Sequence, residues 1–393
     1  MRDSIIAALW LNLVMALTMA GFFAVPVMAP VIAADLGVDT TLLGTFQAIL
    51  WGSSLVTTLA AGNLVARFGA VRVAQLCLLL CALGLGAGSV GALPLLALSA
   101  VLIGLGIGAE TPSSSYLLAR ITPLAHQPLI FSFKQTGLQV GGIIAGFLFP
   151  LLVPSIGWRG SMIAMVSLIA VAMLFLEAPR RRFDEARVPR PAPGGATVWQ
   201  AIAHVCRDPG LLRLGIASFA FVATQVSVNA FLVSYLVAEI HFTLALAGTM
   251  IAAVQAGGLI GRLLWGAISG RVSGAQPLLA ALGAGIAACA FAIGSAAPML
   301  SANALMALCF FTGLTANGWN GVFLAEVARR SPRDQVGRVT GAIFIFGTAG
   351  LMLGPLAFST LAAYAGFASA YVMMSLWSVL GVAFLLPWRR AAR

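Results

Sequence analysis

The chain has 393 residues, of which 61% are hydrophobic and 8% are charged, and its formal net charge is +11. A soluble globular domain carries about 25% charged residues, and a chain of this length cannot bury so much apolar side chain in water. The composition therefore excludes an ordinary water-soluble domain and indicates a lipid environment.

Apolar runs long enough to cross a bilayer follow one another along the whole chain. A spanning helix needs roughly 20 apolar residues, and runs such as 76–85 and 278–293 lack the two-residue alternation of barrel strands. Because backbone groups in lipid must be paired within the protein, we predict an all-α membrane protein. The twelve expected transmembrane helices are 5–33, 42–62, 73–91, 95–118, 129–152, 160–177, 211–237, 244–265, 276–293, 299–327, 339–361 and 368–387.

The longest polar stretch divides these twelve helices into two sets of six. Residues 178–208 are rich in Pro, Gly and Arg, which is typical of a linker. We therefore predict an N-terminal six-helix bundle over 1–177, a cytoplasmic linker over 178–208 and a C-terminal six-helix bundle over 209–393.

The basic residues are distributed asymmetrically between the two sides of the predicted membrane. With the N-terminus inside, the arginines gather in the inside loops, Arg159 alone falls outside, and Lys134 falls within a span. This bias places both termini in the cytoplasm of a bacterial cell, with the chain in the inner membrane. It also argues against a nucleic-acid partner, because no continuous basic surface remains.

The two halves repeat each other at nearly constant offsets. An offset of 204 residues aligns the first two spans of one half with those of the other, and an offset near 209 aligns later segments. Examples are Asp35 with Glu239, Gly44 with Gly248, Arg67 with Arg271, Pro123 with Pro332 and Gly157 with Gly366. Two parallel repeats of this kind are the arrangement of carriers that rock around a site at mid-membrane.

The loop after the second span reads GNLVARFGAVR over 62–72, with a weaker copy over 266–271. This loop resembles the signature G-x-L-a-D-R-x-G-R-[RK] of the major facilitator superfamily, and the resemblance covers the whole chain. Residues 157–159 and 177–181 resemble further family turns, and residues 131–137 are similar to bacterial permeases near the cyanate-transporter group. The resemblance implies the superfamily fold, although Ala66 stands at the acidic position of the signature. The expected cytoplasmic gating motif consists of Gly62, Arg67, Gly69, Arg72, Arg271 and Glu326.

Two ionisable residues at membrane depth are candidates for chemistry, because a charge there costs several kcal/mol. Lys134, the only lysine, lies roughly 8 Å from the cytoplasmic end of its span, and Glu110 lies roughly 12 Å deep. We predict that they pair in one state and that a proton or the substrate breaks the pair. The alternatives are a snorkelling lysine, a static ion pair, or a Glu110 bonded to Thr111 and Ser114. Glu326 is expected to pair with a loop arginine such as Arg271.

Uncharged polar side chains within the spans indicate a polar cavity. Several share a helix face at a spacing of four residues, although hydrogen bonds that only join helices are an alternative explanation. Together with Lys134, the candidate substrate-binding residues are Gln135, Gln139, Gln225, Asn229, Asn317, Trp319, Asn320, Gln47 and Trp51.

These features predict a secondary active transporter that moves a small solute by alternating access. Proton coupling through Glu110 and a small organic or inorganic anion as substrate are favoured, and the alternative is a drug/proton antiporter that exports hydrophobic compounds. The expected partners are the solute, a proton or counter-solute and the lipid bilayer, and we expect a monomer without cofactor or metal. A membrane enzyme would need clustered acids, histidines or a metal set at one depth, which the sequence lacks. The two-half repeat argues against a simple pore, whereas a transporter-like sensor is an alternative.

Overall fold

Helices make up all the regular structure of the described residues. The computed structural model describes residues 2–177, 183–184, 198–269, 274–331 and 336–386. Its helices, in chain order, are α1 (Arg2–Leu36), η1 (Thr40–Leu42), α2 (Leu43–Phe68), α3 (Ala70–Ser89), α4 (Leu93–Ile121), η2 (Leu124–His126), α5 (Gln127–Gln135), α6 (Gly137–Phe175), α8 (Val198–Arg207), α9 (Pro209–Ala238), α10 (Leu244–Ser269), α11 (Gln276–Ala296), η3 (Ala297–Met299), α12 (Ala302–Ala316), α13 (Asn320–Arg330) and α14 (Val336–Leu385). The predicted all-α fold class is confirmed.

The lengths of these helices account for twelve bilayer crossings. Over the described ranges, nine stretches are long and apolar enough to cross a membrane. Two of them, Leu129–Phe175 and Val339–Leu385, have 47 residues each. A helix of that length measures about 70 Å, whereas one crossing of the hydrocarbon core takes about 30 Å. Each therefore holds two crossings, which are separated at Gly157 (φ 68°) and at Gly366 (φ 81°). The remaining crossing, the tenth in chain order, consists of α12 and α13, on either side of residues 317–319.

The chain packs as two units, which we describe separately. Unit 1 comprises Met1–Pro193 and Leu236–Ala252, and unit 2 comprises Gly194–Tyr235 and Ala253–Arg393. Of the segment predicted to be a linker, the structure describes residues 183–184 and 198–208, and the remainder lies outside the described residues.

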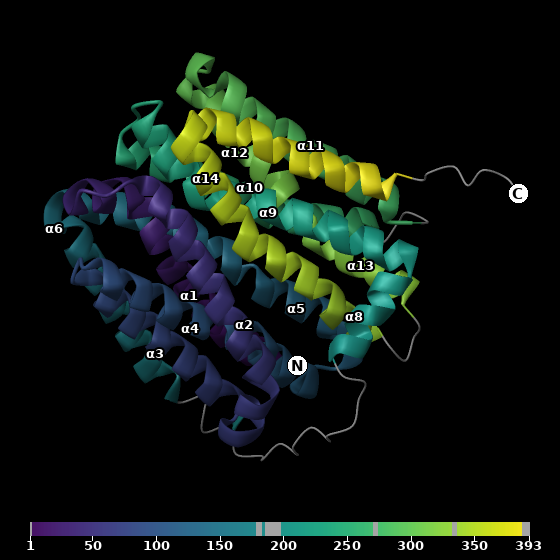
Figure 1. Cartoon of the computed structure of the whole chain (residues 1–393). Helices are drawn as coiled ribbons and strands as arrows, with labels where there is room; N and C mark the ends of the chain where they lie inside the picture. The colour runs from purple at the N-terminus through teal and green to yellow at the C-terminus, as the bar shows by residue number, and fades with distance from the viewer. Residues whose placement is uncertain (1, 178–182, 185–197, 270–273, 332–335, 387–393) are drawn as a thin grey trace, which may run out of the picture. The chain divides into compact units, whose positions relative to one another are not determined.

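Close helix contacts in unit 1 depend on glycine. In this unit α1 packs against α6, and α4 packs against both α2 and α3 (Figure 1). A Cβ atom at Gly104 would lie 2.1 Å from the carbonyl oxygen of Leu50, and one at Gly108 would lie 2.0 Å from that of Ser54. Glycine at these positions therefore allows the backbones of α2 and α4 to approach closely.

The same contact recurs in unit 2 at the offsets of the sequence repeat. A Cβ atom at Gly313 in α12 would lie 1.7 Å from the carbonyl oxygen of Val254 in α10. Val254 follows Leu50 by 204 residues (254 minus 50), and Gly313 follows Gly104 by 209 (313 minus 104). The predicted repeat is therefore confirmed in the packing as well as in the sequence.

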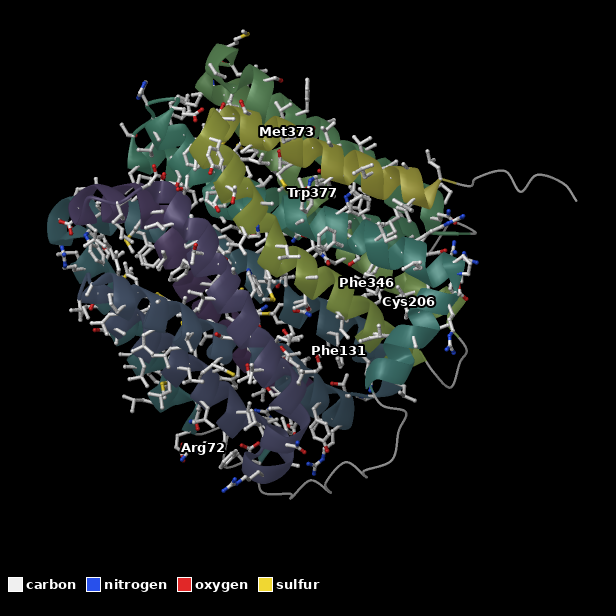
Figure 2. All side chains as sticks on the ribbon, viewed as in Figure 1. Arg72, Phe131, Cys206, Phe346, Met373 and Trp377 are labelled. Carbon is white, nitrogen blue, oxygen red and sulfur yellow. The ribbon has the colours of Figure 1, made fainter. Side chains whose placement is uncertain are left out.

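Aromatic side chains fill much of the interior of unit 2. Phe231 stacks on Phe358 with ring centroids 4.5 Å apart. Trp377, labelled on the C-terminal part of α14 in Figure 2, stacks on Phe219 with ring centroids 5.4 Å apart. The C-terminal part of α14 lies beside α11 (Figure 1). These contacts hold α9, α11 and α14 in fixed positions around the polar groups described below.

Candidate functional site

A buried ion pair joins α4 and α5 in unit 1. The Nζ atom of Lys134 lies 2.7 Å from Oε2 of Glu110, and each side chain is 2% exposed. The predicted pairing of these two residues is therefore present in the structure. Removing either charge from a pair with so little exposure is destabilising, because the ion that is left has lost its hydration and has no partner.

The carboxylate of Glu110 is only partly engaged by its neighbours. Its Oε2 atom accepts hydrogen bonds from Lys134 Nζ at 2.7 Å and from Thr111 Oγ1 at 3.1 Å. Its Oε1 atom is buried and has no hydrogen-bond partner within the part of the chain that the structure describes. An unpaired carboxylate oxygen in a dry environment can accept a proton or a donor group from a solute.

Lys134 lies close to the boundary between α5 and α6 in the fifth crossing, where the backbone keeps helical angles (φ −64°, ψ −23° at Thr136). Helix α5 ends at Gln135 and α6 begins at Gly137, so Thr136 separates them. The amide nitrogen of Asn12 in α1 donates to the carbonyl oxygens of Phe133 at 2.8 Å and Lys134 at 3.3 Å, and to Thr136 Oγ1 at 3.0 Å. Asn12 thus satisfies carbonyl groups at the end of α5. Asn12 was not among the predicted site residues, although an amide within an apolar run was a usable signal.

The two glutamines near Lys134 lie on opposite sides of Thr136. Gln135 ends α5, and its buried Oε1 atom has no hydrogen-bond partner among the described residues. Gln139 lies in α6 and is fully buried. The predicted polar neighbourhood of Lys134 therefore exists, but it is built from two helices.

Gln47 and Trp51 form a second polar position in unit 1, on α2. Gln47 is fully buried, and neither its Nε2 nor its Oε1 atom has a hydrogen-bond partner in the described ranges. The indole Nε1 of Trp51 is likewise buried and without such a partner there. The Trp51 ring packs against Phe22 of α1 at 5.5 Å between centroids.

Three amide side chains form a closed ring of hydrogen bonds in unit 2. Asn229 Nδ2 donates to Asn317 Oδ1 at 3.0 Å, Asn317 Nδ2 donates to Gln255 Oε1 at 3.5 Å, and Gln255 Nε2 donates to Asn229 Oδ1 at 2.8 Å. The second N–H of Asn229 donates to the carbonyl oxygen of Gln225 at 3.0 Å. Each amide oxygen has a second lone pair, and Gln255 and Asn317 each have a second N–H, so the ring has capacity for a polar solute. Gln255 was missed by the sequence analysis because, unlike the other glutamines considered, it has no polar neighbour at four-residue spacing.

The amide ring lies at an interruption of the tenth crossing. Residues 317–319 form a turn between α12 and α13. Trp319 is buried beside the ring, and its Nε1 donates to Gln225 Oε1 at 3.0 Å. Asn320 begins α13 and is half-buried. Hydrogen-bonding groups freed at a helix interruption are typical of solute sites in membrane carriers.

The sequence model of the Major Facilitator Superfamily matches residues 11–301. The chain belongs to the Major Facilitator Superfamily. A curated Haemophilus influenzae protein named "Putative metabolite transport protein" is 25% identical over 283 residues, which cover 69% of this chain and 68% of that protein. The family assignment makes this chain a multi-pass membrane transporter of a small molecule, and the resemblance seen in the sequence is confirmed.

Solved structures share the fold over nearly the whole chain. A bacterial homologue of the human lysosomal transporter Spinster, inward-facing and unoccupied, matches with a TM-score of 0.80 at 16% identity, covering 98% of this chain and 96% of its own. Its occupied form matches with a TM-score of 0.76. A POT family transporter in complex with 5-aminolevulinic acid matches with a TM-score of 0.75 at 12% identity, covering 96% of this chain and 94% of its own. At these identities the likeness shows the fold.

The superfamily signature loop lies between α2 and α3 in unit 1, and a carboxylate from a later segment of the chain binds it. Gly69 links the two helices with φ 89°, a conformation that favours glycine. Asp184 accepts hydrogen bonds from the backbone N–H groups of Val71 at 3.0 Å and Arg72 at 2.8 Å. The signature acid is absent at Ala66, but a carboxylate from beyond the sixth crossing thus occupies the N-terminus of α3, where the helix dipole favours it.

Further polar contacts connect this loop to the end of the sixth crossing. Arg72, labelled in Figure 2, donates through Nη1 to Gln75 Oε1 at 2.9 Å, and Gln75 Nε2 donates to Glu177 Oε2 at 3.3 Å. Arg67 lies in the last turn of α2 with its guanidinium 5.1 Å from the ring centroid of Phe68.

Glu326 in unit 2 pairs with two arginines of its own helix. Its fully buried carboxylate lies 2.6 Å from Arg329 Nη2 and 2.6 Å from Arg330 Nε, and it accepts from the backbone N–H of Ala275 at 3.3 Å. The arginines are three and four residues further along the same helix, because α13 continues past Glu326, and residues at that spacing are neighbours. Arg271, the predicted partner, lies outside the described residues.

Proposed function

We propose that the chain is a proton-coupled carrier that moves a small organic or inorganic anion across the bacterial inner membrane by alternating access. The observation that carries this proposal is the ion pair of Lys134 and Glu110, which is 2.7 Å long and 2% exposed on both sides. The basic inside loops support cytoplasmic termini. The printed name of the Haemophilus influenzae relative, a metabolite transport protein, supports a small metabolite as solute.

The ion pair links anion binding to proton binding through charge balance. When Glu110 is ionised, its carboxylate occupies Lys134, and the pair has no net charge. A proton on Glu110 removes that partner, so the ammonium group is left as an unmatched buried charge, which is unfavourable. An anion that binds Lys134 restores the match. Proton and anion thus enter together, which is the behaviour of a symporter.

Reconstitution into proteoliposomes tests this coupling. We expect wild-type protein to accumulate a labelled anion when an inward proton gradient is imposed, and also to exchange it without a gradient. Glu110→Gln should abolish gradient-driven accumulation and retain exchange, because the neutral amide mimics the protonated acid. Asp35→Asn is the matched control, since Asp35 pairs with Arg159 at 2.8 Å in an exposed position. Unchanged proton dependence in Glu110→Gln would refute coupling through this residue.

Export of hydrophobic compounds is a second candidate function, and one cavity favours it. A cavity of about 240 Å³ in unit 1 is bordered mainly by apolar residues of α1, α2 and α4, including Ile32, Phe46 and Leu96, with Asp39 among its few polar neighbours. Such a space suits an apolar solute. Dye extrusion together with the absence of saturable exchange of any small anion would favour this function over the first.

A further inference from the structure

We infer that unit 1 holds two separate solute positions, and that the one formed by Gln47 and Trp51 binds a hydroxyl group of the solute away from the ion pair. The inference rests on the proposed function, because it presumes that a small anion is carried. It adds a selective site that the charge pair does not provide.

The groups at this position leave their hydrogen-bonding capacity unused. Gln47 is 0% exposed, and both polar atoms of its amide lack a partner in the described part of the chain. The indole N–H of Trp51, one turn along α2, is in the same situation. Buried donors and acceptors are normally paired, and leaving them unpaired costs free energy. A ligand group that both donates and accepts would therefore be stabilised here.

Helix α1 adds acceptors at the same level. Pro26 and Pro30 lie inside α1, and proline has no N–H to donate to the carbonyl group four residues earlier. The carbonyls of Phe22 and Pro26 therefore lose their helical donors, and the Phe22 ring is the one that contacts Trp51. Amide, indole and backbone carbonyls are all uncharged, so they suit a hydroxyl better than a carboxylate.

The separation of Trp51 from Lys134 follows from their contacts with α1. Helix α1 runs without interruption from Arg2 to Leu36. Asn12 contacts the end of α5 at Lys134, and Phe22 contacts Trp51. The ten residues from Asn12 to Phe22 correspond to about 15 Å along the helix axis.

The contacts between α2 and α4 give a second, independent value for the separation, here between Gln47 and Glu110. The two helices run in the same direction, because Gly104 meets Leu50 and Gly108 meets Ser54. Glu110 lies two residues beyond Gly108, and Gln47 lies seven residues before Ser54. These nine residues correspond to about 13 Å along the axis. A carboxylate and a hydroxyl on adjacent carbons cannot span this separation, so a small hydroxy acid occupies the two positions in turn.

Thermal shifts of the purified full-length protein with matched pairs of acids test the inference. The probes are acetate with glycolate, propionate with lactate, and succinate with malate, in which the second member adds one hydroxyl. We expect at least one hydroxylated acid to raise the Tm of the wild type more than its partner does. Gln47→Met should remove that difference, whereas Leu50→Met, a volume-conserving change on the same helix, should retain it.

Glu110→Gln separates the two positions from each other. It should retain the preference for the hydroxylated acid, because the ion pair lies on a different level. Loss of the preference in Glu110→Gln, its survival in Gln47→Met, or equal shifts by both members of every pair would overturn the inference. A failure of all six acids to shift Tm would instead count against the proposed anion substrate, and the inference would fall with it.

Discussion

Replacing Lys134 by methionine would remove the charge but keep much of the apolar stem, and so tests how the buried pair contributes to stability. The partner carboxylate would remain 2% exposed. Breaking a buried pair by removing one member costs about 3–5 kcal/mol, because the other charge is left uncompensated. For a chain of 393 residues, the usual unfolding entropy converts this loss to a fall in Tm of about 4–6 °C.

Thermal unfolding of detergent-purified protein would measure this fall, and a double-mutant cycle would assign it. We expect the double variant Lys134→Met/Glu110→Gln to recover most of the lost stability, since no unmatched charge remains. Arg159→Gln is the control. It breaks the exposed pair with Asp35, in which the side chains are 46% and 39% exposed, and should cost at most about 1 kcal/mol. Equal effects of Lys134→Met and Arg159→Gln, or a double variant as unstable as the single one, would refute the reasoning.

Three further predictions concern contacts within unit 1. Gly104→Ala should prevent stable folding, because its Cβ would lie 2.1 Å from a backbone oxygen. Gly86→Ala should be tolerated, because its Cβ meets open space. Expression level and gel filtration would show the contrast between the two variants. Asn12→Leu should lower stability by about 1–3 kcal/mol through the lost hydrogen bonds from Asn12 to Phe133, Lys134 and Thr136. This loss would be measured as a lower Tm, and an unchanged Tm would contradict the assigned role of Asn12. Asp184→Ala should cost about 0.5–2 kcal/mol by removing the cap of α3. Asp184→Asn should cost less, because its amide keeps one of the two acceptor oxygens but loses the charge, and a chemical denaturation series would compare the two.

The repeat shows why part of the architecture was predictable. Gly157 and Gly366 stand 209 residues apart in the sequence (366 minus 157), and both adopt positive φ in the structure. Local backbone geometry of this kind depends on the residue itself, because glycine alone lacks the Cβ that opposes such angles. The positions of these turns could therefore be anticipated before any packing was known.

The ion-pair partners of the buried carboxylates depend on packing, and the sequence predicted them only in part. The pairing of Lys134 with Glu110 followed from comparable depth on neighbouring spans, since two buried charges have few other ways to be matched. Glu326 was expected to pair with a loop arginine such as Arg271, which lies outside the described residues, and it pairs with Arg329 and Arg330 on its own helix. The helix there extends past the expected end of the span, and helix ends are the least certain feature of a sequence-based prediction.

The sequence by itself determined that this protein is helical, crosses a membrane twelve times and repeats its first half, because hydrophobic length, charge asymmetry and glycine positions act locally along the chain. Only the tertiary structure decided which polar groups meet. Asn12 joins the end of α5, and Gln255 completes the ring with Asn229 and Asn317. The amide atoms of Gln47 have no hydrogen-bond partner among the residues that the structure describes. These outcomes depend on how far each helix slides and rotates against its neighbours, and in an apolar chain close packing of small residues sets that register.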